Sequence, residues 1–143
     1  MPNTYAVTAH SDASPEAVFQ TLIRAQTWPS WSPIDAADVE GGKDPSQPQQ
    51  VGDTRMFRTG RAVSHERIVE LVTDRRFEYE MVGGGPFRSY RGVVELAPAA
   101  RGGTDITWSG TFQPALRFTG RFWQWYLTRF MQRMADGLAA YAG

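Results

Sequence analysis

The chain of 143 residues contains no cysteine, which excludes disulfide bonds and thiolate chemistry. A chain without cysteine is compatible with a reducing compartment. Its first stretch, MPNTYAVTAHSD, also lacks the basic segment and the apolar segment of a secretory signal. We therefore expect a cytoplasmic protein.

The sequence also lacks an excess of charge and a long apolar run. Fifteen acidic residues balance fifteen basic ones, so no overall field attracts the chain to nucleic acid. No apolar run approaches the ~18 residues that a membrane-spanning helix needs. We expect neither a nucleic-acid partner nor an integral membrane segment.

Metal and cofactor signals are scarce. The only histidines are His10 and His65, and no HExxH-type spacing is present. The three glycines at 83–85 lie between two predicted strands, whereas a phosphate-binding glycine loop precedes a helix. We therefore predict no metal site and no cofactor.

What the chain does contain is a regular succession of strand and helix patterns. Residues 4–10 alternate like a strand, and Ser14 and Pro15 are typical of the start of a helix. Pro29 disfavours helical geometry at Trp28, so we expect that helix to stop or break there. Residues 41–53 have the composition of a loop.

The second half of the chain predicts a sheet followed by one long helix. Strand patterns with glycine-marked turns cover 54–60, 61–72, 75–82, 83–98 and 101–114. Residues 115–142 carry an apolar stripe of helical period from Leu116 to Tyr141. Successive antiparallel hairpins are the simplest connection. We predict one α+β domain over 1–143, with a curved antiparallel sheet wrapped around a long C-terminal helix.

Five segments in this order resemble the START/Bet v 1-like (SRPBCC) superfamily, in its polyketide cyclase/dehydrase-like branch. They are SPEAVFQTL, WPSWSP, GDTRMF, ERIVELVTDRRFEY and GGTDITWSGTFQP. The resemblance implies a helix-grip fold with an apolar cavity between the sheet and the C-terminal helix. Members of this superfamily bind or transform lipids, sterols, polyketides and other hydrophobic molecules.

The resemblance also places Trp28 and Trp31 on a short helix that closes one end of the cavity. Both are ligand-binding candidates, and ordinary core packing is the alternative, above all for Trp31. Trp28 is the one of the pair that we expect to touch a ligand.

His65 is the candidate catalytic base, and its neighbour Glu66 is the alternative cavity residue. Adjacent strand residues face opposite sides, so only one of the two can point into the cavity. Val63, Val69 and Leu71 favour His65 inside, whereas Ile68 favours Glu66, and the pattern leaves both registers open. A structural role for His65 is the further alternative.

Further ligand-binding candidates are the large side chains with polar tips on the predicted inward faces. They are Tyr79, Tyr90 and Trp108 on strands, with core packing as the alternative reading. Phe122 and Tyr126 on the long helix are candidates as well. Phe118, Phe122 and Trp125 give that helix a second apolar face. A cavity mouth, a homodimer interface or a membrane surface would cover it, and so would the loop at 41–53.

Three functions follow as hypotheses. The first is a protein that binds a polyketide-, lipid- or aromatic-like molecule, with cyclisation or dehydration as its reaction if it is an enzyme. The second is a non-catalytic carrier of such a ligand. The third is an interaction module that uses the second apolar face of the last helix. Acid–base groups in the cavity favour an enzyme, and a closed cavity favours the module.

Overall fold

The computed structural model describes residues 3–83 and 85–143 and shows one antiparallel sheet with the strand order β1-β7-β6-β5-β4-β3-β2. Its strands are β1 (Asn3–Ser11), β2 (Ala36–Val39), β3 (Thr54–Thr59), β4 (Ala62–Val72), β5 (Arg76–Met81), β6 (Phe87–Pro98) and β7 (Thr104–Pro114). The helices are α1 (Pro15–Leu22), α2 (Trp28–Trp31) and α3 (Gly120–Ala142), with 3-10 turns at Ala25–Thr27 and Glu40–Gly42.

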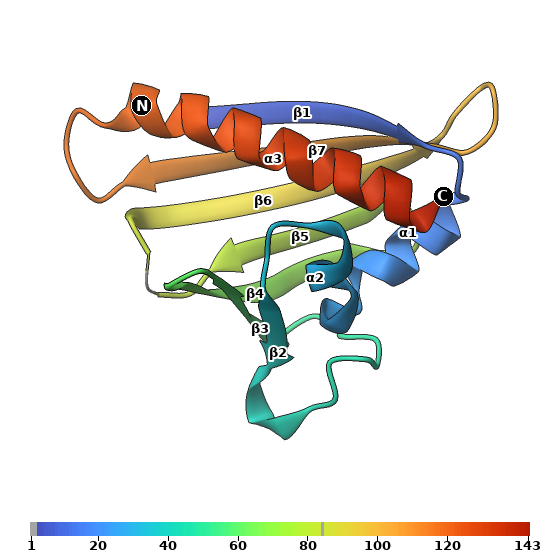
Figure 1. Cartoon of the computed structure of the whole chain (residues 1–143), viewed down its shortest axis with the longest axis horizontal. Coiled ribbons are helices and arrows are strands. Elements are labelled where there is room, and N and C mark those ends of the chain that lie inside the picture. The colour runs from blue at the N-terminus through green and yellow to red at the C-terminus, as the bar shows by residue number, and fades with distance from the viewer. Residues whose placement is uncertain (1–2, 84) are drawn as a thin grey trace.

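The long helix α3 lies across one face of the curved sheet, and α1 and α2 lie beside it (Figure 1). We call the sheet face that α3 covers the inner face and the opposite one the outer face. This arrangement confirms the predicted α+β helix-grip fold. The five strand patterns of the second half correspond to β3 through β7. Of the glycine turn predicted at 83–85, Gly84 lies outside the described residues.

The start of α1 is the one that the sequence predicts. The Ser14 hydroxyl accepts a hydrogen bond from the backbone N–H of Ala17 at 3.2 Å, and Pro15 occupies the first helical position. The helix buries Val18 and Leu22 completely. Apolar burial on this face, together with the cap, holds the N-terminal segment against the sheet.

The expected break at Trp28 is wrong in detail. The first helix ends six residues earlier, at Leu22, and Trp28 has helical angles (φ −59°, ψ −39°) as the first residue of α2. Pro29 is tolerated because it lies in the first turn of α2, where its missing N–H would have no helical partner. The loop at 41–53 packs under this region, and the Gln49 side-chain oxygen accepts from the N–H of Ala25 at 2.9 Å.

Two other boundaries differ from the expectation. The sequence predicts no strand at Ala36–Val39. In the structure these residues pair with β3 and form the edge strand β2. The last helix begins at Gly120 and not at 115, because the N–H of Ala115 still donates to the carbonyl of Pro86 at 2.8 Å. Leu116 therefore lies outside α3 and is exposed, as is Tyr141 at the other end of the stripe.

The middle and C-terminal parts of α3 supply the helix side of the core. Leu127, Met131, Met134 and Leu138 are buried against the inner face. The helix approaches α2 closely at Gly137, where an added Cβ would lie 1.8 Å from the carbonyl oxygen of Trp31. Only glycine fits at that contact without moving one of the two helices.

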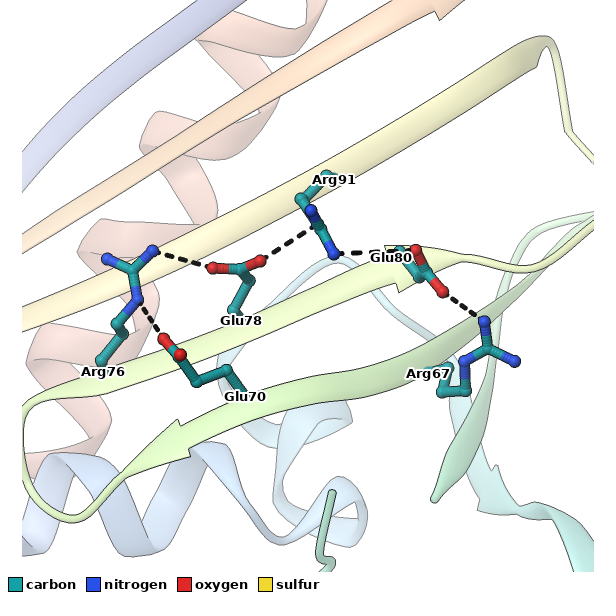
Figure 2. A network of polar contacts seen from close by, with 6 residues as sticks. All are labelled: Arg67, Glu70, Arg76, Glu78, Glu80 and Arg91. Atoms are coloured by element: carbon teal, nitrogen blue, oxygen red, sulfur yellow. Dashed lines mark hydrogen bonds and ion pairs between the residues drawn. The ribbon is translucent and has the colours of Figure 1, made fainter. Parts of the chain in front are cut away.

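The outer face carries a network of charged side chains across β4, β5 and β6 (Figure 2). Glu78 accepts from Arg76 at 2.8 Å and from Arg91 at 3.0 Å, and Arg76 also reaches Glu70 at 2.6 Å. Glu80 pairs with Arg67. Strand alternation places these side chains opposite the buried Phe77 and Tyr79.

Candidate functional site

A cavity of about 290 Å³ lies between the inner face of the sheet, α2 and α3. Its walls are mainly aromatic and aliphatic side chains from β3 to β7 and from the two helices. Among the described lining residues, Glu66 is the only charged one. The exposed lining residues are Ala62, Val63, Gly85, Pro86 and Tyr126, and we call this end the cavity mouth.

Tryptophans form the wall at the deep end. Trp28 and Trp108 are almost completely buried, and their ring centroids are 5.8 Å apart in an edge-on arrangement. Trp31 packs against both, with centroids 4.8 Å from Trp28 and 6.3 Å from Trp108. It does not line the cavity itself. Of the two tryptophans in the motif, Trp28 alone is in a position to contact a ligand.

Three phenols meet on the inner face. The hydroxyls of Tyr5 and Tyr90 are hydrogen-bonded, and the hydroxyl of Tyr79 accepts from Nε1 of Trp108 at 3.1 Å. Burial raises the pKa of Tyr79 and of Tyr90 well above the ordinary value. Both side chains line the cavity, and their hydroxyls are neutral at physiological pH.

Glycines on two neighbouring strands make room for these rings. A Cβ at Gly92 would lie 2.3 Å from the Tyr79 ring, and one at Gly110 would lie 2.4 Å from the Tyr5 ring. Gly92 and Gly110 are direct partners in the β6–β7 ladder. The two rings therefore lie close over the sheet, which leaves depth for a cavity beneath α3.

Glu66 brings a carboxyl group into this apolar surrounding. Its Oε1 atom is shielded from solvent and has no hydrogen-bond partner among the described residues. Burial raises the pKa of Glu66 from 4.5 to about 7, and the positive charge of Arg55 opposes that rise. A carboxyl group with a pKa near 7 is able to release and accept a proton at neutral pH.

Arg55 stands directly opposite Glu66 on β3 and is completely buried. Its guanidinium carbon lies 4.5 Å from the centroid of Trp28 and 4.8 Å from that of Phe77, and Nη1 donates to the carbonyl of Leu22 at 2.7 Å. Burial lowers its pKa to about 10. The sequence reading missed Arg55 because an arginine on a short strand is normally a surface residue.

The structure resolves the register that the sequence leaves open. Glu66 and Ile68 face inward, and a β-bulge between Ile68 and Glu70 then brings Leu71 to the same face. His65 faces outward, and its Nδ1 lies 3.2 Å from a carboxylate oxygen of Glu40. His65, the predicted catalytic base, therefore does not line the cavity.

The cavity brings together most of the predicted ligand-binding residues. Trp28, Tyr79, Tyr90, Trp108 and Tyr126 line it. Trp31 packs behind the wall, and Phe122 points away with 54% of its surface exposed. The loop at 41–53 lies against the α1 region, so it does not provide the predicted alternative cover for Phe122.

Residues 3–83 and 85–143 contain no group of three or more His, Asp or Glu side chains able to hold a metal ion. Within the same residues, no helix is both long enough and apolar enough to cross a membrane.

Comparison with known proteins adds a family and a set of similar folds. Residues 3–143 match the profile of the family described as "Polyketide cyclase / dehydrase and lipid transport". No curated protein matches the chain in sequence.

Several solved structures share the fold. A START superfamily protein from Mycobacterium smegmatis is 13% identical with a TM-score of 0.82, over 98% of this chain and 97% of that one. The protein XoxI from Bacillus cereus is 19% identical with a TM-score of 0.77, over 97% and 94%. Major latex-like protein 151 from Panax ginseng is 15% identical with a TM-score of 0.73, over 100% and 99%. At these identities the similarity concerns the fold.

Proposed function

The chain belongs to the polyketide cyclase/dehydrase and lipid transport family, and we propose that it binds a small hydrophobic molecule between the sheet and α3. The observation that carries this proposal is the cavity of about 290 Å³ with mainly apolar walls. Binding pockets for small molecules range from roughly 300 to 1,000 Å³. The cavity lies just below the small end of that range, which favours a compact ligand of two or three fused rings over a long lipid chain.

Aromatic side chains support the choice of a ring-shaped ligand. Trp108 and Tyr90 line the cavity from the sheet, and Trp28 lines it from α2. Rings pack on rings in offset or edge-on contacts, which add to the free energy gained from burial alone. An aromatic or fused-ring ligand therefore uses more of this surface than a flexible alkyl chain.

Naphthalene is a suitable first probe, because it is apolar and rigid. We expect it to shift tryptophan emission and to raise the melting temperature, because a ligand that binds only the native state stabilises it. Ser64→Trp places a large ring in the cavity wall and should abolish both effects. Val93→Trp, on the outer face of β6, is the matched control and should preserve them. Binding that survives Ser64→Trp unchanged, or no binding at all, would overturn the proposal.

The carboxyl of Glu66 supports a second candidate function, which is acid–base catalysis of cyclisation or dehydration. Such reactions begin when a base removes a proton next to a carbonyl group, and a carboxyl with a pKa of about 7 suits that step. Glu66 takes this role in place of His65, which faces outward. Deuterium exchange into 2-tetralone provides the test, because exchange requires removal of the proton. We expect Glu66→Gln to abolish protein-catalysed exchange and His65→Gln to preserve it, and the opposite result would return the role to His65.

The exposed apolar side chains of α3 and the turn before it support the homodimer predicted through this helix. Phe118, Phe122 and Trp125 expose 100%, 54% and 58% of their surfaces. The segment between Asp105 and Asp136 holds four arginines and no acidic residue. A symmetric pairing of this face would bring like charges together, so the dimer should strengthen as salt screens them. Light scattering is expected to show a dimer that Trp125→Ser dissociates, and a monomer at every salt concentration would exclude it.

A further inference from the structure

Glu66 combines three properties that its position on β4 imposes. It lines a cavity with otherwise uncharged walls, its Oε1 has no partner among the described residues, and Arg55 stands opposite it. A carboxylate has only acceptor sites, and a shielded acceptor without a donor is costly. A ligand whose donor group binds the carboxyl of Glu66, which lines the cavity, reduces that cost.

Arg55 does not satisfy Glu66 directly. The Nε and Nη2 atoms of Arg55 are also without partners among the described residues, so the two side chains share no hydrogen bond. The guanidinium lies against the rings of Trp28 and Phe57, and Arg55 is not one of the cavity-lining residues. A ligand in the cavity therefore meets the negative charge of Glu66, whereas the positive charge stays behind the aromatic wall.

We infer that the cavity selects an apolar ring skeleton that carries a hydroxyl or N–H donor, that this donor binds Glu66, and that anionic ligands such as fatty acids are rejected. This inference rests on the proposed binding function and specifies the ligand class of the same site. The donor requirement follows from a cavity-lining carboxyl group that is short of hydrogen-bond donors, and the rejection follows from like charge in an apolar surrounding. Tyr79 and Tyr90 lie in the same wall, and because their hydroxyls are neutral they add no charge to the cavity.

Three naphthalene derivatives separate the effect of the donor from the effect of the negative charge, because they share one skeleton. 2-Naphthol carries a donor, 2-methoxynaphthalene replaces that donor by a methyl ether, and 2-naphthoate carries a negative charge. At about pH 8 Glu66 is mostly ionised, because its pKa is about 7. We expect 2-naphthol to bind at least about tenfold more tightly than the ether, the range for a hydrogen bond to a charged group. 2-Naphthoate should bind most weakly of the three.

Variants assign the selectivity to Glu66. Glu66→Leu should remove the preference for 2-naphthol over the ether and restore binding of 2-naphthoate. Glu66→Gln serves as the second variant should the leucine side chain disturb folding, and it should likewise restore 2-naphthoate. Glu78→Gln, on the outer face of β5, is the matched control and should keep the wild-type order.

The outcomes separate this inference from the function on which it rests. Equal affinity of the wild type for all three probes would overturn the inference and leave the binding function intact. Tightest binding of 2-naphthoate would overturn it as well, since it would mean that Arg55 governs the cavity. Failure of all three probes to bind would overturn both.

Discussion

Glutamate side chains have opposite surroundings on the inner and outer faces of the sheet. On the outer face, Glu78 has two arginine partners at 2.8 and 3.0 Å in a network that continues to Glu80 (Figure 2). On the inner face, Glu66 faces a cavity and has a shielded oxygen without a partner. One carboxylate is stabilised by its neighbours, whereas the other has an oxygen that no described residue satisfies. The difference agrees with the proposal that the inner face binds a ligand.

The largest expected difference between the faces is in packing. Trp108 is completely buried beside Trp28 and Trp31, so Trp108→Ala should lower the free energy of unfolding by about 3–5 kcal/mol. Val93→Ala, on the outer face of β6, should cost less than about 1 kcal/mol. Urea midpoints at unchanged m-value give both numbers. A loss below about 1 kcal/mol for Trp108→Ala would mean that the ring contributes little to the core.

The next difference is in the dependence of stability on pH. Burial raises the pKa of Glu66 from 4.5 to about 7, so the folded state holds this proton more tightly than the unfolded state. The resulting stabilisation is complete below pH 4.5 and is lost as the pH rises through 7. Glu66→Gln should therefore be more stable than the wild type at about pH 8, by on the order of 2 kcal/mol after allowance for partial exposure.

That advantage of Glu66→Gln should shrink towards zero near pH 4.5. Urea unfolding of the two proteins across this range measures it, because groups other than Glu66 titrate equally in both and cancel. Parallel stability curves would contradict the assigned environment of Glu66.

A smaller effect is expected for the paired carboxylate. Glu78→Gln removes the charge that binds Arg76 and Arg91, and ion pairs near the surface contribute little. We expect a loss of about 0.5–1 kcal/mol that declines at high salt, whereas the effect of Glu66→Gln should change little because its surrounding is apolar. Unfolding at low and high salt compares the two. The same salt response in both variants would remove the distinction between the faces.

The smallest effect concerns His65. Its ring contacts Glu40 on the outer side at 3.2 Å, and both side chains are partly exposed. His65→Gln should change stability by less than about 0.5 kcal/mol and leave the affinity for naphthalene unchanged. Fluorescence titration of the variant checks this. A loss of affinity would place His65 in the binding site after all.

Much of the fold was predictable because its elements carry strong local patterns. β5 alternates between buried rings and outer charges, and the Ser14 cap defines the start of α1. The edge strand Ala36–Val39 was missed because four residues without alternation form a strand only through pairing with β3. The start of α3 was misplaced because a long-range hydrogen bond from Ala115 to Pro86 extends the sheet.

The site was less predictable than the fold, because it depends more on contacts between segments that are far apart in the sequence. Tyr79 and Trp108 lie on regular strands, so alternation alone places them on the inner face. The choice between His65 and Glu66 depends on the bulge after Ile68, which changes the alternation in a way that the sequence pattern does not reveal. The aromatic rings around Arg55 are those of Trp28, Phe57 and Phe77, which belong to three separate segments. Only the folded chain brings them together.

A crystal structure of the protein with 2-naphthol bound tests the central claim most directly. We expect the rings to lie in the cavity between Trp108 and α3, with the hydroxyl within hydrogen-bond distance of the Glu66 carboxylate. The charged network around Glu78 on the outer face should remain unchanged. A probe bound only on the exposed rings of α3, with the cavity unoccupied, would contradict the account.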